Sequence, residues 1–387
     1  MRSIVKIAAG ALAGLLAAAP GLAAGQPVIA GSPETVFDWA AARCETWDIP
    51  DTPARAWRTP SGRVRLVAGS ERSRIAEGLS LATLRHGCRV AYEGGERDDP
   101  AAYDDRAWIA ATWAEGTRVI ALAHVEYHGH LRPGRCPAGD YMACWRNAIL
   151  ELVSEDGGQT FTRRGLVAAL PYPYPEGAGK RAGYFSPSNI FRRGDYLYVY
   201  VFAEATGAQK RGACLLRRPV GGGPGDWRAW DGAGFTRAFA DPYRQAISDP
   251  GAHVCEPVPG IRSTISSVVE DGRSGRFLAV TPATLEDTDG VRRSGIWWTQ
   301  SANLIDWARP RLLLAVPLLW RRDCGAEAAY AYPSFLDGDG PSANLDVVEG
   351  GFWLYLVRMP LGEDCSVGPK RDLLRYPVSL PDGWDRP

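Results

Sequence analysis

The feature that most constrains the fold is a strand–turn–strand unit that recurs along the 387 residues. Each unit has an apolar strand, a turn that contains glycine, and a second apolar strand. The units occupy residues 53–68, 107–123, 187–203, 263–280 and 333–357. Further candidate strands lie between or after them, at 149–167, 213–236, 294–314 and 373–380. Helical periodicity is scarce, and residues 73–86 are the best candidate for a short helix.

A hairpin of this kind cannot bury both of its faces by itself, but hairpins packed radially can. Units spaced about 50 to 80 residues apart therefore predict an all-β chain that forms a β-propeller. The expected propeller has five blades, each of four antiparallel strands, around a central channel. The 44 glycines and 29 prolines would supply its turns. A β-sandwich is the alternative, but sandwiches rarely repeat hairpins this regularly.

The first residues have the layout of a secretory signal peptide. Arg2 and Lys6 precede an apolar run that ends in small residues, which predicts cleavage near Ala24. A membrane anchor is the alternative, but the run is short for a bilayer span and is interrupted by glycine and proline. We therefore expect a signal peptide at 1–24 and a single propeller domain at 25–387. The mature protein would be periplasmic or secreted, not attached to a membrane, and monomeric.

The cysteines agree with export. An even number of cysteines, eight here, predicts disulfides in an exported chain. Cys136 and Cys144 would close the shortest loop and are the best local pair, whereas the other connections stay open. No cysteine belongs to a CxxC motif, which argues against zinc and redox roles.

Charge and aromatic content narrow the class of partner. The 44 Lys and Arg residues balance the 44 Asp and Glu residues, and this argues against a nucleic-acid partner. The 14 Trp and 15 Tyr residues are more informative. Most are expected in the core, but in exported proteins some stack on the apolar faces of sugars. A carbohydrate ligand is therefore expected.

The stretch SEDGGQTF, residues 154–161, matches the Asp-box pattern at every defined position. Asp156 is expected to accept hydrogen bonds from its own turn, Gly158 to take a backbone conformation closed to other residues, and Phe161 to pack beneath the turn. The role is structural, since the motif closes an outer hairpin. A degenerate second copy, SANLIDW, lies at 301–307.

Polar side chains at the ends of the inner hairpins are the candidate site residues, because blade strands begin and return at one rim of the channel. Glycoside hydrolysis needs one ionised carboxylate and one that holds a proton near neutral pH. The predicted ionised group is Asp51 and the predicted acid is Glu256, with Glu126 in reserve. The alternative is that these are rim carboxylates paired with arginines. The predicted substrate-binding residues are Arg55, Arg72, His124, His128, Ser188, Glu204, Arg262, Glu327, Tyr330, Tyr332 and Arg358.

The alternating residues His124, Glu126 and His128 share one face if the strand persists. Two imidazoles and a carboxylate can bind a divalent metal. Alternate residues on a strand lie about 7 Å apart, however, so three ligands for one ion would need a distorted strand. A row of hydrogen-bonding groups that faces sugar hydroxyls is favoured. No cofactor is expected, although a structural divalent cation is compatible with the sequence.

The segments IPDTPARAW, YFSPSNIFRRGDYLYVYV, WWTQSANLIDW and YAYPSFLD resemble the five-bladed β-propeller glycosidases, namely arabinanases, arabinofuranosidases, β-xylosidases and invertase-like enzymes. The likeness spans nearly all of the mature chain. It implies that Asp51 is the carboxylate that precedes the first strand, and Glu256 is the nearest candidate for the acid. Where these families often have an aspartate in the third blade, this chain has Ser186 and Ser188.

A second resemblance is to sialidases, which also carry Asp boxes. Asp48 stands where sialidases place an arginine that grips the carboxylate of sialic acid, so sialidase activity is disfavoured. The expected function is hydrolysis of furanosides or of glycans that contain pentoses. A non-catalytic propeller that binds glycan or protein is the alternative, favoured by the missing acid in the third blade.

Overall fold

The computed structural model describes residues 25–137, 139–175 and 179–384. The predicted signal peptide at 1–24 lies outside the described residues. None of the described helices is long and apolar enough to span a membrane. The only α-helix in the described ranges is α1 (Trp39–Ala42), and short 3₁₀ turns occur at Pro100–Ala102, Gly129–Leu131, Pro224–Asp226 and Pro250–His253.

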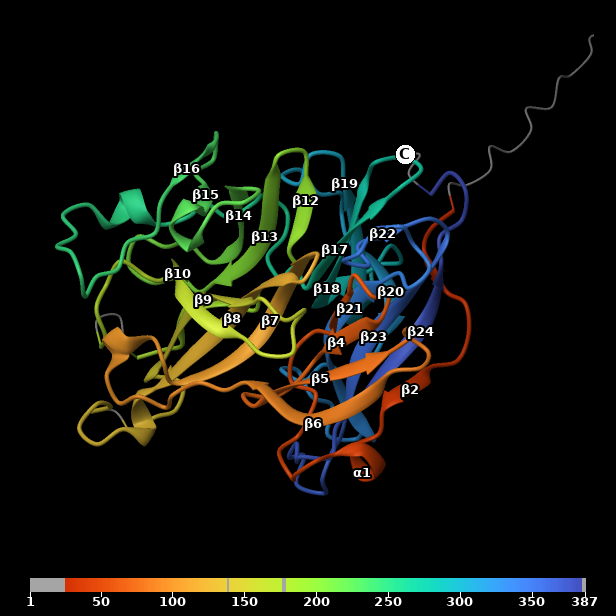
Figure 1. Cartoon of the computed structure of the whole chain (residues 1–387), viewed down its shortest axis with the longest axis horizontal. Helices are drawn as coiled ribbons and strands as arrows, with labels where there is room; N and C mark the ends of the chain where they lie inside the picture. The colour runs from red at the N-terminus through yellow and green to blue at the C-terminus, as the bar shows by residue number, and fades with distance from the viewer. Residues whose placement is uncertain (1–24, 138, 176–178, 385–387) are drawn as a thin grey trace, which may run out of the picture.

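The strands form consecutive antiparallel meanders (Figure 1). The first has β3 (Arg55–Arg58), β4 (Val64–Val67), β5 (Ser73–Gly78) and β6 (Arg85–Tyr92). The second has β7 (Arg106–Glu115), β8 (Arg118–His128), β9 (Trp145–Ser154) and β10 (Thr162–Ala168). The third has β11 (Ala182–Phe185), β12 (Phe191–Arg193), β13 (Tyr196–Ala203), β14 (Gly212–Pro219), β15 (Arg228–Trp230) and β16 (Phe235–Arg237).

The remaining strands form two further meanders. The fourth has β17 (Ser267–Asp271), β18 (Phe277–Glu286), β19 (Arg292–Ser301) and β20 (Arg311–Ala315), with β22 (Val347–Val348) parallel to β17. The fifth has β21 (Ala328–Leu336), β23 (Gly351–Pro360) and β24 (Asp372–Ser379). The N-terminal strands β1 (Val28–Ile29) and β2 (Glu34–Phe37) both pair with β24, so the start of the described chain completes the last sheet.

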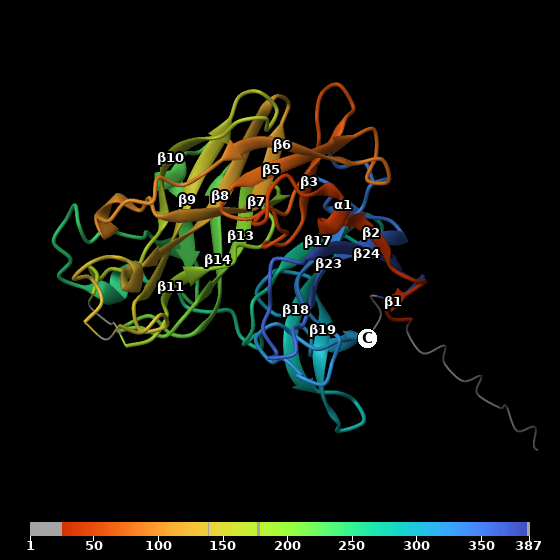
Figure 2. The ribbon, with the colours of Figure 1, turned by 90° about the horizontal axis from the view of Figure 1, so that it is seen from below.

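The meanders surround a common axis marked by Arg55. Its guanidinium donates to the carbonyls of Ala110, Pro187 and Ser266 and to the hydroxyl of Ser334. These partners lie on or beside the inner strands of the other four meanders. Seen from below, the colours follow one another around the molecule, and the blue C-terminal strands lie beside the red N-terminal ones (Figure 2). The predicted all-β β-propeller is therefore confirmed.

The predicted count of five blades stays a prediction. Hydrogen bonds group the described strands into four sheets, because β11 pairs in parallel with β9 and antiparallel with β13, which joins two meanders. Apolar side chains fill the space between neighbouring meanders. Leu122 of β8 and Val199 of β13 belong to one buried cluster, and Val280 of β18 and Leu354 of β23 belong to another.

The helix expected at 73–86 is wrong, because the segment forms β5 and the start of β6. The hydroxyl of Thr83 accepts hydrogen bonds from the amides of Leu79 and Ser80 and holds the connecting turn. A Cβ on Gly78 would meet the Thr83 carbonyl oxygen at 2.5 Å, so glycine allows the two strands to approach. These are the outer strands of the first meander, which the hairpin pattern did not predict.

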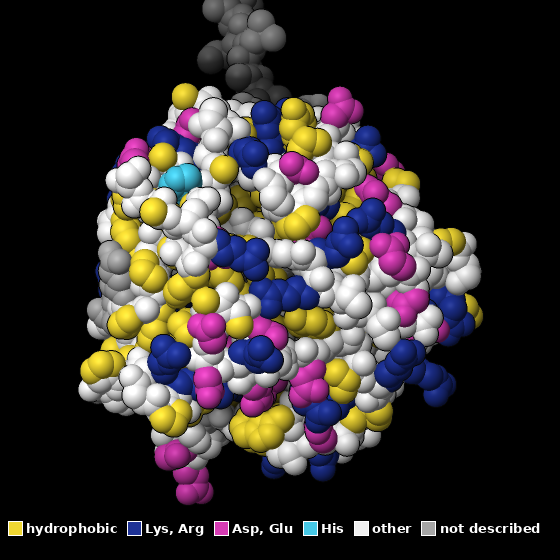
Figure 3. Space-filling model, turned by 60° about the vertical axis from the view of Figure 1, so that its left-hand side comes forward, with side chains coloured by type: hydrophobic (Ala, Val, Ile, Leu, Met, Phe, Trp, Pro, Cys, Tyr) yellow, Lys and Arg dark blue, Asp and Glu magenta, His cyan; other side chains and the backbone are white. Residues whose placement is uncertain are grey.

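The eight cysteines form four disulfides, and the predicted pair Cys136–Cys144 is confirmed. The other pairs are Cys44–Cys88, Cys214–Cys255 and Cys324–Cys365. Acidic and basic side chains are interspersed on the face shown in Figure 3, as the balanced net charge suggests.

The SEDGGQTF turn joins β9 to β10. The Asp156 carboxylate accepts hydrogen bonds from the amides of Gln159 and Thr160 and from the hydroxyls of Ser154 and Thr160. Gly158 has φ of +97°, and a Cβ there would lie 2.2 Å from the Trp57 ring. The expected bonding of Asp156 and the expected backbone of Gly158 are both confirmed.

Candidate functional site

A cleft with two lobes lies at the end of the axis where strands β7, β8, β11 and β21 meet their connecting loops. The first, here named the carboxylate lobe, has a volume of about 330 Å³ and is lined by Asp51 and Glu126, among others. The second, the arginine lobe, has a volume of about 430 Å³. Both lobes share one wall, formed by Pro53, Arg181, Phe185, Ser186, Leu319, Trp320 and Tyr332.

Asp51 precedes β3 and is held by groups from distant parts of the chain. Its backbone amide donates to the carbonyl of Ala68 at 2.9 Å. The Tyr332 hydroxyl donates to its carboxylate at 3.0 Å, and the Arg371 guanidinium forms an ion pair with the same oxygen. Burial raises the pKa of Asp51, and Arg371, Tyr332 and Trp108 oppose that rise. The carboxylate therefore has a fixed position and a positive partner.

Glu126 lies near the end of β8 and faces the same lobe. Its side chain is 14% exposed. Burial, and then the charge of Asp51, raise the pKa of Glu126 to about 8. Among the described residues, Glu126 has only imidazoles within ion-pair distance, with His128 Nε2 at 2.8 Å and His124 Nε2 at 3.6 Å. Glu126 therefore keeps its proton at a pH at which a carboxyl group paired with arginine would already be ionised.

Both histidines are neutral at pH 7, because burial lowers the pKa of His124 to about 3 and that of His128 to about 4. The buried Nδ1 of His128 has no hydrogen-bond partner, which favours the tautomer with the proton on Nε2. That Nε2–H donates to Oε2 of Glu126. The amide of Asn147 donates to Nε2 of His124, so this nitrogen is an acceptor. Oε1 of Glu126 is thus left to carry a proton toward the lobe.

Not all of the predicted catalytic and substrate-binding residues line the cleft. Seven of the predicted site residues line it: Asp51, Glu126, His124, His128, Arg262, Tyr330 and Tyr332. Glu204 is outside both linings but contacts two residues of the cleft, accepting hydrogen bonds from Arg181 at 2.6 Å and from Arg211 at 3.0 Å. The others lie elsewhere: Arg55, Arg72, Ser188, Glu256, Glu327 and Arg358 are outside both linings.

Each of these departures has a physical reason. Arg55 and Ser188 are buried, and their polar atoms bond other protein groups. Arg72 pairs with Glu45 at 2.7 Å. The guanidinium of Arg358 lies 3.7 Å from the carboxylate of Asp372, with which it forms an ion pair.

The position of Glu256 matters most for the chemistry, because this residue was the predicted acid. Its amide donates to the carbonyl of Trp230, and its carboxylate pairs with Lys210 at 2.7 Å. The side chain is 39% exposed. Glu327 is exposed as well. The structure therefore brings the reserve carboxylate Glu126 to Asp51, and leaves Glu256 outside the lobe.

Several cleft residues had no signal in the hairpin pattern. Arg106 and Trp108 lie on β7, where they read as ordinary strand residues. Trp320 lies in the connection before β21, and its side chain is 68% exposed. Arg371 directly precedes β24. Arg181 lies over the rings of Phe185, Trp145 and Trp320, at 4.5, 5.2 and 5.9 Å from their centres.

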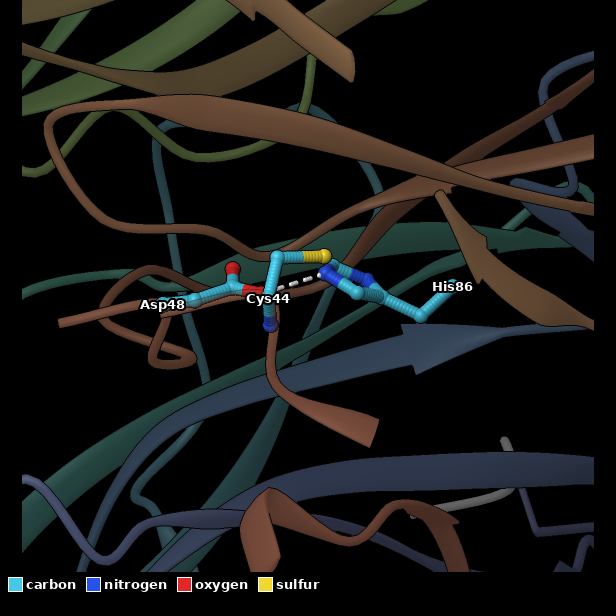
Figure 4. A group of neighbouring side chains, drawn as sticks. All are labelled: Cys44, Asp48 and His86. Carbon is cyan, nitrogen blue, oxygen red and sulfur yellow. Dashed lines mark hydrogen bonds and ion pairs between the residues drawn. The ribbon is translucent and has the colours of Figure 1, made fainter. Parts of the chain in front are cut away.

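One group of side chains in the described ranges has the compactness of a metal site. Ligand atoms of Cys44, Asp48 and His86 lie within 4.8 Å of one another (Figure 4). Cys44 forms a disulfide with Cys88, however, so its sulfur is not a thiolate ligand. His86 Nε2 lies 2.8 Å from Asp48, which Arg74 also approaches at 3.4 Å. The group is an ion-pair cluster rather than a set of metal ligands.

No family model and no curated protein matches the chain. Among solved structures, an α-L-arabinanase from Cellvibrio cellulosa complexed with arabinohexaose has a TM-score of 0.49 and 11% identity, over 84% of this chain and 90% of that chain. The catalytic domain of the GH62 α-L-arabinofuranosidase from Coprinopsis cinerea has a TM-score of 0.47 and 10% identity, over 90% and 96%. The RS223 β-xylosidase has a TM-score of 0.46 and 10% identity, over 91% and 96%. At these scores and identities the likeness carries no weight for an activity.

Proposed function

We propose that the protein is an exported glycoside hydrolase that cleaves glycans containing pentoses in the carboxylate lobe. The observation that supports this most is the unlike environment of the two carboxylates that line one lobe. Asp51 has an arginine as partner, whereas Glu126 has neutral imidazoles and a pKa of about 8. One ionised and one protonated carboxyl are what hydrolysis of a glycosidic bond requires.

Glu126 is assigned the role of general acid. At neutral pH it holds a proton, and the bond from His128 to Oε2 leaves Oε1 to protonate the leaving oxygen of the glycoside. The positive charge that develops on the sugar ring would then be stabilised by Asp51. Asp51 acts either as nucleophile or as the base that activates a water molecule, depending on its separation from the acid across the substrate.

Aromatic groups of the lobe would position the sugar. Trp108, Trp320 and Tyr332 line it and present apolar faces for stacking. The choice of pentose glycans as substrates comes from the resemblance of IPDTPARAW to propeller glycosidases. Export is proposed from the predicted signal peptide and from the four disulfides.

The test is hydrolysis of a panel of arabinofuranosides, xylosides, fructosides, galactosides and sialosides by the wild type and by single variants. Asp51→Asn and Glu126→Gln are expected to lower kcat by about 10²-fold or more on any accepted substrate. Glu155→Gln is a matched control, because Glu155 is 70% exposed in the β9–β10 turn. Glu256→Gln tests which glutamate is the general acid. A loss of activity in this variant would favour Glu256 over Glu126.

A folded protein that hydrolyses nothing in the panel, yet binds one of its glycans, would instead be a non-catalytic glycan-binding propeller. Retention of full activity in both cleft variants would place the catalytic groups elsewhere.

A further inference from the structure

The arginine lobe differs in charge from the carboxylate lobe. Arg181, Arg211, Arg262 and Arg321 all line it. None of its lining residues in the described part of the chain is an aspartate or glutamate. The remaining polar groups are hydroxyls, among them those of Ser263 and Thr264. The lobe therefore offers hydrogen-bond donors and positive charge, with no carboxylate in its wall.

Part of this charge is already neutralised. Glu204 pairs with Arg181 at 2.6 Å and with Arg211 at 3.0 Å. These two guanidiniums also lie against aromatic rings, Arg211 at 4.8 Å from the centre of Phe202. Glu204 and the rings hold them in place. In contrast, neither Arg262 nor Arg321 has an ion-pair partner among the described residues, and both are exposed.

We propose that the arginine lobe binds an anionic substituent of the glycan, either the carboxylate of a uronic acid or a sulfate ester. This inference rests on the proposed function and specifies the class of substrate. Guanidinium groups bind both kinds of oxyanion through paired hydrogen bonds. Arg262 and Arg321 would supply the charge that is not yet paired, and the hydroxyls of Ser263 and Thr264 would supply further donors.

The arrangement of the two lobes also sets the direction of the substrate. They share the wall that carries Trp320 and Tyr332, so a single glycan chain can occupy both. Each arginine that lines the carboxylate lobe has an ion-pair partner, namely Asp51 for Arg371, Glu71 for Arg106 and Glu204 for Arg181. Arg262 and Arg321 of the arginine lobe have none among the described residues, so an anion gains more there. The anionic unit is therefore expected in the arginine lobe, away from the bond that is cleaved, and the neutral pentose at the carboxylates.

Binding calorimetry on the hydrolytically silenced Glu126→Gln protein tests this directly. The probes are a neutral arabinoxylo-oligosaccharide, the same oligosaccharide with a glucuronate branch, and its sulfated form. At low salt, at least one anionic probe is expected to bind about tenfold more tightly than the neutral one, because a hydrogen bond to a charged group is worth that much. The difference should shrink as salt is added.

The added changes Arg262→Gln and Arg321→Gln should remove the preference while the affinity for the neutral probe is kept. Arg244→Gln is the matched control, because Arg244 is 85% exposed and outside the cleft lining. Circular dichroism verifies that each variant folds. A preference for only the glucuronate probe or only the sulfated probe identifies the anion. Equal binding of all probes, no binding at all, or a preference that survives in the arginine variants would overturn the inference.

The two proposals can fail separately. Hydrolysis of neutral glycans without any anionic preference would remove this inference alone. An anionic preference in a wild-type protein that hydrolyses no glycan, charged or neutral, would remove the proposed catalytic function alone.

Discussion

Glu126 is the residue whose protonation should control activity at alkaline pH. Burial and the neighbouring Asp51 charge raise its pKa to about 8. A general acid acts only while it is protonated, so kcat/KM should fall as pH rises through about 8. The measurement is a profile of kcat/KM from about pH 5 to pH 10. An activity that stays level through the upper end of this range would contradict the role given to Glu126.

Arg371 should control the other limb of the same profile. Its charge opposes the rise that burial causes in the pKa of Asp51. In Arg371→Ala the pKa of Asp51 should rise further. The pH below which kcat/KM falls, because Asp51 becomes protonated, should therefore move up by about one pH unit. Lys370→Ala is the control, since Lys370 is an exposed neighbour. Equal shifts in both variants would indicate a general effect of charge rather than the contact with Asp51.

At the scale of an element, the β9–β10 turn depends on a single carboxylate. Asp156→Ala removes the acceptor of four hydrogen bonds and should lower the free energy of unfolding by about 1–2 kcal/mol in urea denaturation. Hydrolytic activity at low temperature should be unchanged. Glu155→Ala in the same turn is the control, and an equal loss there would contradict the importance of these bonds.

The same turn predicts a dependence of stability on pH. Burial opposes the shift, but hydrogen bonds from Ser154 and Thr160 hold the pKa of Asp156 below its ordinary value of 3.8. The turn's contribution to stability is therefore complete above pH 3.8, and is lost as pH falls below it. The difference in stability between wild type and Asp156→Ala should accordingly narrow on acidification below that pH.

Two connections that form the cleft are joined by the Cys324–Cys365 disulfide. One joins β20 to β21 and carries Trp320, and the other joins β23 to β24 and carries Arg371. Replacing this pair by alanines should lower stability by about 2–4 kcal/mol and also raise KM. The Cys214–Cys255 pair closes a loop of the same length, 41 residues, and is the control. A similar rise in KM in both disulfide variants would argue against a role of Cys324–Cys365 in positioning the two cleft connections.

The sequence predicts an element well when adjacent residues determine it, and poorly when contacts with distant residues do. Each inner hairpin has its own alternation and turn, and these were predicted correctly. Residues 73–86 were not, because their apolar spacing also fits a helix, and pairing with β4 decides the outcome. Asp51 and Glu126 could be nominated from strand ends, whereas Arg371 reaches Asp51 across 320 residues of sequence. Glu256 could not be excluded, because its partner Lys210 is set by the packing of separate loops.

For the whole molecule, Arg55 is the side chain on which the inner strands depend. It is 1% exposed, and burial lowers its pKa to about 9, so it stays charged at neutral pH. No carboxylate pairs with it among the described residues. The carbonyls of Ala110, Pro187 and Ser266 share its donors instead. The planar fork of donors thus joins separate meanders at the axis, and it spreads five donors over three nitrogens where an ammonium group has three donors on one.

Arg55→Met should therefore lower the free energy of unfolding by about 3 kcal/mol or more, because it leaves several buried carbonyls without a donor. Arg55→Lys should be nearly as harmful, since it keeps the charge but not the geometry. The measurement is urea denaturation followed by circular dichroism. Arg58→Met on the same strand, where one guanidinium bond to Gly338 is lost, should cost about 1 kcal/mol and is the control. If Arg55→Lys were as stable as wild type, the charge alone would suffice, and the propeller would not depend on the guanidinium as a junction between its meanders.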